Sequence, residues 1–235
     1  VLSKKSRKIT MNSTFPSQER VLQALLQGIQ SAEKNFLFWT NNRLSLSSGP
    51  HKIISIHVAQ ELSLIENPPE VFIDATVADI LRCSLPDRKA FKSYMEKNAL
   101  SQGTFGITLD ERFTHHNNND SISRVIVSLH NGVRNVKPEY THEIERLCKM
   151  LHRKKREDST LDYGVFAFYA DISVLARKKL EKRLVELKAS FDAVVEHFPS
   201  LNARFIATPI HNVPDVGEWM AGCYVIEPKA EIVIE

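Results

Sequence analysis

The sequence predicts an α/β fold, in which a mixed central sheet is flanked by helices and preceded by a helical N-terminal region. Residues 17–103 carry mostly helical patterns, and residues 112–187 alternate strand-like with helix-like segments. Two apolar runs in that second stretch are continuous enough for strands covered on both faces. This succession favours parallel neighbours joined by right-handed crossovers, with antiparallel additions at the edges of the sheet.

The composition fits one compact unit that includes residues 17–103 and an α/β core over residues 104–235. With 235 residues, 43% hydrophobic and 25% charged, the chain is long enough to bury one sizeable core. Residues 1–16 are expected to be a disordered basic arm, since its basic residues account for the positive net charge: Lys4, Lys5, Arg7 and Lys8. Either Val1 or Met11 would serve as the native start, because nothing before Met11 has a core-forming pattern.

No apolar run approaches the eighteen or so residues that a bilayer span needs, and the first ten residues lack the apolar stretch of a secretory signal. We therefore expect a cytoplasmic protein with no membrane partner. The three cysteines, Cys83, Cys148 and Cys223, are far apart and form no CxxC pair. They are expected to be buried thiols rather than disulfides or zinc ligands.

The helical region begins with a helix from Ser17, as its cap, to about Phe36. Apolar residues recur there at spacings of three and four, at Val21, Leu22, Leu25, Leu26, Ile29 and Ala32. Residues 40–50 are polar and predict a loop. Residues 51–65 favour a second helix, although their β-branched start leaves a strand over residues 53–58 as the competing interpretation.

Pro68 and Pro69 then break the chain before a short strand over residues 71–73. Asp74 is a suitable cap for a short helix over residues 75–83. Residues 86–99 predict another helix, which Pro86 opens and Gly103 closes.

The core is expected to begin with a short strand from Arg112, followed by an exposed turn over residues 115–120 and a strand over residues 125–129. Pro138 suits the first turn of the next helix. That helix would bury one stripe of side chains: Tyr140, Ile144, Leu147 and Leu151. A charged loop over residues 152–158 leads to a second central strand at residues 165–168.

The last part of the chain predicts a long helix followed by two strands. Ser173 is the expected cap of this helix, and Pro199 ends it. Residues 204–210 and 218–226 are expected to pair as strands around the loop HNVPDVG.

The order of elements over residues 105–190 resembles the restriction-endonuclease-like superfamily, the PD-(D/E)xK phosphodiesterases. In that family an aspartate lies on one strand, a Glu-x-Lys or Asp-x-Lys on the next, and a helix and a further strand complete the core. ERFTHHNNNDSISRVIVSLHNGVRN occupies the place of the two active strands. HEIERLCKMLHRKK and YGVFAFYAD resemble the helix and strand that follow. The resemblance rests on element order and apolar pattern.

The resemblance also locates where this chain departs from the family. Thr114 stands in the place of the strand aspartate, Ser128 in the place of the glutamate, and His130 in the place of the lysine. Hard Mg²⁺ needs oxygen-rich coordination, which a hydroxyl and an imidazole do not supply. The departures imply a degenerate member without the usual metal site and without a cofactor.

Other acids leave an active enzyme open as an alternative. Asp110, Glu111, Asp120 or Glu143 would then hold Mg²⁺ or Mn²⁺ in a non-standard arrangement, although solvated loop acids are the commoner explanation for the first three. His130 and Ser128 form no catalytic triad, because no carboxylate orients the imidazole. His115, His116, His130 and His142 lack the HExxH spacing of a zinc site.

Two basic groups are candidates for contact with DNA or RNA. The first comprises Arg146, Lys149, Arg153, Lys154, Lys155 and Arg156, and the second comprises Arg177, Lys178, Lys179, Lys182, Arg183 and Lys188. If both helices flank one side of the sheet, these side chains would form one phosphate-binding surface. Charge runs also mark solvated helix faces, so a purely structural explanation stays open.

The sequence thus predicts a catalytically impaired protein of nuclease fold, acting as a nucleic-acid-associated or protein-interaction subunit. The resemblance implies a place in restriction or defence. The alternatives are an active metal-dependent nuclease and a scaffold without a nucleic-acid role, in which residues 231–235 pair with an edge strand of a second copy to form a homodimer.

Overall fold

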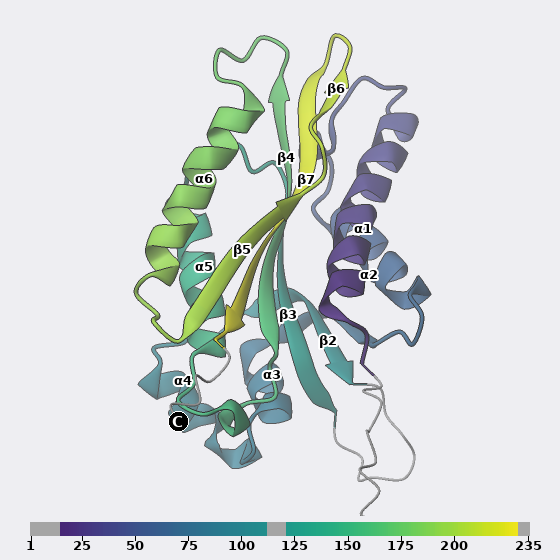
Figure 1. Cartoon of the computed structure of the whole chain (residues 1–235). Coiled ribbons are helices and arrows are strands. Elements are labelled where there is room, and N and C mark those ends of the chain that lie inside the picture. Colours follow the sequence, from purple (N-terminus) through teal and green to yellow (C-terminus); the bar gives the residue numbers. More distant parts are fainter. Residues whose placement is uncertain (1–14, 112–120, 230–235) are drawn as a thin grey trace, which may run out of the picture.

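A computed structural model describes residues 15–111 and 121–229. It shows a seven-stranded mixed sheet with helices on both faces (Figure 1). The strands lie in the order β1-β2-β3-β4-β7-β5, and β6 pairs with β7. The α-helices are α1 (Gln18–Trp39), α2 (Lys52–Leu64), α3 (Val77–Ser84), α4 (Phe91–Lys97), α5 (Pro138–Leu151) and α6 (Leu180–Val195). The strands are β1 (Glu70–Thr76), β2 (Thr104–Glu111), β3 (Ile122–His130), β4 (Tyr163–Ser173), β5 (Leu201–Ala207), β6 (His211–Val213) and β7 (Gly217–Pro228).

The central parallel pair is β3 and β4, and α5 forms the crossover between them. The other strand pairings in the described part of the chain are antiparallel, so the sheet has fewer parallel neighbours than predicted. The reason is the position of β7. Because β7 is antiparallel to both β4 and β5, β5 runs in the same direction as β4, as a crossover through α6 requires, but β7 lies between them.

The sheet separates two hydrophobic cores. Side chains of β3 alternate between them: Val125, Val127 and Leu129 pack with α1 and α2, whereas Ile126 packs with α3, α5 and α6. Ten consecutive residues of β4, from Tyr163 to Ile172, are buried. This strand is therefore covered on both faces, as its apolar run predicts.

Helices α1 and α2 cover one face of the sheet and confirm the helical prediction for both segments. Ser17 caps α1, since its side chain accepts a hydrogen bond from the Arg20 amide. Gly28 lies where the two helices meet, and a Cβ atom there would be 2.5 Å from the Cα of Val58. The absence of a side chain at Gly28 thus permits the close approach of the two helices.

Two predicted features of the next segment are wrong. Asp74 is not a helix cap but lies inside β1 with a positive φ of 57°. Thr76 caps α3 instead, its Oγ1 accepting from the Asp79 amide at 3.1 Å. The predicted helix over residues 86–99 is a 3₁₀ turn, Arg88–Ala90, followed by the shorter α4.

The core strands also begin and end elsewhere than predicted. The strand that precedes β3 is β2, which starts at Thr104 rather than at Arg112. Ser173 ends β4 and caps no helix, because the chain makes a turn there before α6 begins at Leu180. In the C-terminal region, residues His211–Val213 of the predicted loop form β6, a short hairpin partner of β7. The α5 prediction is confirmed, and its four predicted stripe residues are buried.

The described helices include none that is long and apolar enough to cross a membrane. Cys148 and Cys223 are buried, Cys83 is half-buried, and none of the three is in a disulfide within the described residues. The basic arm up to residue 14, the turn at residues 115–120 and the C-terminal segment at residues 231–235 were predicted features that lie outside the described residues.

Candidate functional site

Ser128 and His130 lie at the end of β3, on the face that α5 covers. The Ser128 hydroxyl and the His130 Nε2 are 2.9 Å apart. The imidazole stacks on Phe166 at 4.3 Å between ring centroids and meets the Tyr140 ring edge-on. Burial, with smaller effects of His51 and Arg146, lowers the pKa of His130 to about 3. The imidazole is therefore neutral near pH 7 and is a poor proton acceptor.

Glu143 on α5 is the acid that the structure brings to this position. It forms an ion pair with Arg146, whose Nη2 also donates to the Thr104 carbonyl at 2.9 Å. Burial raises the pKa of Glu143, and the Arg146 guanidinium and the Ser128 hydroxyl oppose that rise. The end of β3 thus holds a hydroxyl, a neutral ring and an acid with its own cationic partner.

Asp110 and Glu111 are the last two residues of β2, not loop residues before a strand as predicted. Successive strand side chains point to opposite faces. Accordingly, Asp110 accepts a hydrogen bond from the Ser121 hydroxyl, whereas Glu111 pairs with Arg124 at 3.1 Å. Burial raises the pKa of Asp110, and Glu70 on the neighbouring strand adds to the rise. These two acids do not face a common ion.

Asp110 is also far from Glu143. It lies opposite Ser123 at the start of β3, whereas Glu143 is beside Ser128, five residues further along the strand and roughly 17 Å away at the rise of a β-strand. Among residues 15–111 and 121–229, no three His, Cys, Asp or Glu side chains are placed to hold a metal ion. Thr114, His115, His116 and Asp120 lie outside the described residues.

The two predicted basic groups lie on the same side of the sheet but at opposite ends of it. Both α5 and α6 follow strands that run in the same direction, so both helices begin at one end of the sheet and finish at the other (Figure 1). The structure therefore does not bring the basic residues into one surface. We call the group at the start of α6 the carboxyl-edge basic group: Arg177, Lys178, Lys179, Lys182 and Arg183. The α5-end basic group is Arg153, Lys154, Lys155 and Arg156.

The two groups differ in how their charges are used. In the α5-end basic group, Arg153 holds the following loop, donating to the carbonyls of Ser159 at 2.5 Å and Leu161 at 2.9 Å. In the carboxyl-edge basic group, Lys178 pairs with Glu186 and Lys179 with Glu218, while Arg177 and Lys182 are exposed. Outside the two groups, Lys188 pairs with Asp192 within α6 at 2.5 Å, and Lys149 pairs with Glu145 within α5 at 2.9 Å.

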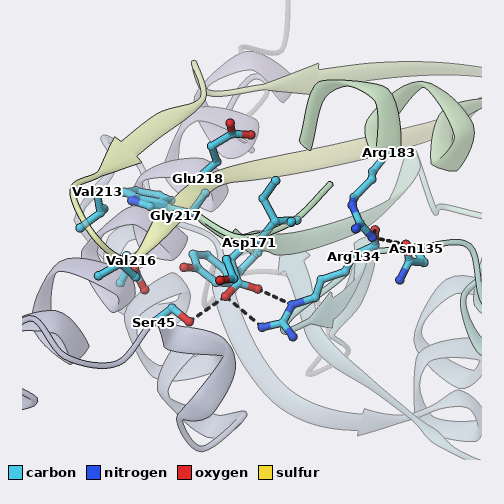
Figure 2. A pocket seen from close by; sticks show the side chains of 15 residues that line it. Ser45, Arg134, Asn135, Asp171, Arg183, Val213, Val216, Gly217 and Glu218 are labelled. Carbon is cyan, nitrogen blue, oxygen red and sulfur yellow. Dashed lines mark hydrogen bonds and ion pairs between the residues drawn. The ribbon is translucent and has the colours of Figure 1, made fainter. Parts of the chain in front are cut away.

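A cavity of about 360 Å³ opens at the carboxyl ends of β3 and β4 (Figure 2). Asp171, at the end of β4, accepts hydrogen bonds from Arg134, which follows β3, and from the hydroxyls of Ser45 and Ser47, each at 2.7 Å. Asp171 is nearly buried, and the paired carboxylate raises the pKa of Arg134. This network joins the loop after α1 to the ends of both parallel strands.

Glu33 is a buried acid of α1 that also lines the cavity. Its Oε2 accepts from the Leu46 amide at 2.8 Å, and the fully buried Tyr169 is beside it. Burial raises the pKa of Glu33 to about 7, against the opposing effects of the Leu46 amide and of Tyr169. Glu33 therefore titrates close to neutral pH, and its contact with the Leu46 amide ties the loop after α1 to that helix.

Sequence reasoning did not identify this cavity. One available signal was position, because Arg134 directly follows one central strand and Asp171 ends the next. Polar side chains that follow two parallel neighbours meet at the same edge of the sheet, where α/β proteins usually bind ligands. Ser45 and Glu33 carry no comparable signal, because they reach the edge through the packing of α1.

No protein-family model, no curated protein and no solved structure matches this chain. What the protein does must therefore be argued from its own side chains.

Proposed function

We propose that this protein is a catalytically impaired relative of the restriction-endonuclease-like superfamily that acts as a nucleic-acid-associated subunit. The main observation in favour of a loss of catalytic activity is the packing of His130. Its neutral imidazole lies against Phe166 and Tyr140 and is bonded to Ser128, at the position where the family would place an active lysine and acid.

The order of the core elements supports the family part of the proposal. Antiparallel β2 and β3 are followed by α5 and then by β4, which pairs with β3. Two adjacent strands, a helix and a further strand are the succession on which the resemblance rests. A fold alone does not determine an activity, so the side chains of the site decide the function.

The carboxyl-edge basic group supports the nucleic-acid part. Residues 174–183 contain five basic side chains and one acid, Glu181, and most of these positions are exposed. Phosphate contacts by Lys and Arg supply most of the sequence-independent affinity for nucleic acids. The α5-end basic group is the weaker candidate, since Arg153 is committed to the loop beneath it.

Binding of a fluorescently labelled DNA duplex, measured by anisotropy over a range of salt concentrations, tests this assignment. The triple variant Lys178→Gln, Lys179→Gln, Lys182→Gln should bind more weakly, with a salt slope reduced by roughly two to three. The matched control is Lys154→Gln, Lys155→Gln, Arg156→Gln, which removes as many charges at the other end of the sheet. Equal losses in both triple variants, or no binding by the wild type, would contradict the assignment.

A cleavage assay tests the impairment separately. With Mg²⁺ or Mn²⁺ present, we expect DNA and RNA to stay intact. Metal-dependent cleavage that disappears in Thr114→Ala, Ser128→Ala or His130→Ala would overturn the proposal. Cleavage lost in Asp110→Ala, Glu111→Ala, Asp120→Ala or Glu143→Ala would establish the rival, an active nuclease with non-standard ligands.

Self-association is a second candidate function, and the edge strand β1 favours it. Phe72 and Ile73 on this strand are each 44% exposed, and an edge strand can pair with another chain. Sedimentation of the wild type and of Phe72→Lys tests this candidate. A dimer that the substitution dissociates, together with no affinity for nucleic acid, would favour the scaffold over the leading proposal.

A further inference from the structure

The cavity at the carboxyl ends of β3 and β4 contains a fixed arginine, Arg183, that forms no ion pair with an acid within residues 15–111 and 121–229. Arg183 donates its Nε to the Lys178 carbonyl at 3.1 Å and its Nη1 to the Arg134 carbonyl at 3.2 Å and to the Asn135 amide oxygen. These three acceptors carry no formal charge. The contacts hold the guanidinium in place without neutralising it.

Two of the three acids that line the cavity, Asp171 and Glu218, are matched by cations. Asp171 faces Arg134. Glu218 accepts from the Leu180 amide and from the Lys179 ammonium, each at 3.1 Å, and these contacts lower the pKa of Glu218. Glu33, with a pKa of about 7, is only partly ionised at neutral pH. The surplus charge of the cavity is therefore positive and is carried by Arg183, reduced by the ionised fraction of Glu33.

The Arg183 guanidinium lies beside Asn135 and the Arg134 backbone, whereas the Arg134 guanidinium is turned toward Asp171 (Figure 2). Within the described residues, Arg134 uses Nε and Nη2 for its contacts and Arg183 uses Nε and Nη1. One terminal nitrogen of each guanidinium thus remains to donate to a ligand, and the Arg134 side chain is 49% exposed. Two such nitrogens suit an anion with several acceptor oxygens, as a phosphate monoester has.

The two aromatic residues that line the cavity, Tyr169 and Trp219, do not offer a surface for a base. One face of the Trp219 ring stacks on His211 at 4.4 Å between centroids, and Tyr169 stacks with it at 5.8 Å. Recognition in this cavity would then depend on the phosphate and be insensitive to the base.

We propose that this cavity binds a phosphate monoester, and that its source is the terminal phosphate of a nucleic-acid strand. The second part rests on the proposed function, since the carboxyl-edge basic group next to the cavity would hold the internal phosphates of the same strand. The site is separate from Ser128 and His130 and requires no metal ion.

Calorimetry with adenosine 5′-monophosphate, cytidine 5′-monophosphate and adenosine tests the cavity without any nucleic acid. The wild type should bind both monophosphates alike and adenosine at least about tenfold more weakly. Arg183→Gln should lose about tenfold in affinity for the monophosphates, and Arg183→Lys should lose less, because it keeps the charge but not the fork. Arg43→Gln, at an exposed arginine that neither lines the cavity nor belongs to a basic group, should bind as the wild type does.

Melting temperatures of the variants identify any that fail to fold. If Arg183→Gln does not fold, the affinity of Arg183→Lys for the monophosphates tests the site instead. Equal binding of adenosine and its monophosphate, or equal losses in Arg43→Gln and Arg183→Gln, would overturn the phosphate site.

Oligonucleotides that end in a 5′-phosphate, a 3′-phosphate or only hydroxyls test the source. A phosphorylated end should tighten binding about tenfold in the wild type and not in Arg183→Gln. Monophosphate binding without any preference for a phosphorylated end would overturn the strand end as the source and leave a site for free phosphate monoesters. If the wild type binds monophosphates but does not bind the DNA duplex in the anisotropy assay, the proposed function is rejected and the phosphate site stands.

Discussion

Asp171 accepts two hydrogen bonds from one guanidinium: Arg134 donates Nε to Oδ1 at 2.9 Å and Nη2 to Oδ2 at 3.1 Å. The two residues lie at the ends of the parallel strands and tie them to the loop after α1 through Ser45 and Ser47. This pair is therefore a structural connection as well as one wall of the cavity.

Asp171→Asn should lower the free energy of unfolding by about 1–3 kcal/mol, because an amide removes the negative charge that four donors share. Urea denaturation measures the change. Asp215→Asn in the exposed β6–β7 turn is the matched control and should change stability by less than about 0.5 kcal/mol. An equally small effect at both positions would show that the connection adds no stability.

Glu33 should make the protein less stable as the pH rises. The pKa of Glu33 is raised from 4.5 to about 7 by burial, so the folded protein keeps this proton to a higher pH than the unfolded chain does. The contribution is complete at low pH and is lost as pH rises through this window, by roughly 3 kcal/mol in total. Unfolding of the wild type and of Glu33→Gln at pH 5 and pH 8 measures the difference. The exposed Glu19→Gln on the same helix should leave the dependence unchanged.

His130 should make the protein less stable as the pH falls, in contrast to Glu33. Burial lowers the pKa of His130 from 6.5 to about 3, so the unfolded chain binds this proton first. The stability that the neutral ring contributes is present above pH 6.5 and is lost as the pH falls, by roughly 3 kcal/mol at pH 4. Acid denaturation should show that His130→Gln does not lose this stability as the pH falls. The variant His197→Gln, at an exposed histidine, should lose it as the wild type does. A wild type with no loss in this range would contradict the buried neutral state.

Gly28→Ala should destabilise the protein by more than about 2 kcal/mol, although alanine normally favours a helix. The added methyl group would meet the backbone of Val58 at 2.5 Å and force α1 and α2 apart. Thermal unfolding of Gly28→Ala measures the effect. Gly103→Ala is the control, because its methyl group would meet only the flexible end of Arg146 at 3.0 Å.

Arg153→Gln should lower the stability by about 1–3 kcal/mol, because it leaves the carbonyls of Ser159 and Leu161 without their donor. Lys154→Gln, the next position and an exposed one, should be nearly neutral. Denaturant unfolding of the two variants compares them. Similar stabilities would mean that Arg153 is an ordinary surface cation.

Local patterns in the sequence predicted what depends on local interactions. The periodicity of α1, the proline at the start of α5 and the apolar run of β4 each describe one element and its burial. The prediction that Ser173 caps a helix was wrong, because a serine at the end of a strand resembles a helix cap. The turn that follows Ser173 delays the start of α6 to Leu180.

The arrangement of the strands and most of the cavity depend on contacts between distant parts of the chain. No pattern within residues 217–228 indicates that β7 lies between β4 and β5. The same holds for Ser45 and Glu33, which reach Asp171 and Tyr169 only after α1 has packed on the sheet. Among the site residues, Arg134 and Asp171 were within reach of sequence reasoning, since Arg134 follows one central strand and Asp171 lies near the end of the other.

The position of β7 has a consequence for biosynthesis. A ribosome makes β4 long before it makes residues 217–228, the only described segment that pairs with the second edge of β4. Until then a long apolar strand keeps an open row of amides and carbonyls, which is a template for aggregation. Nascent chains that end before Gly217 should therefore be clients of chaperones, and the sheet should close only after residues 217–228 have left the ribosome.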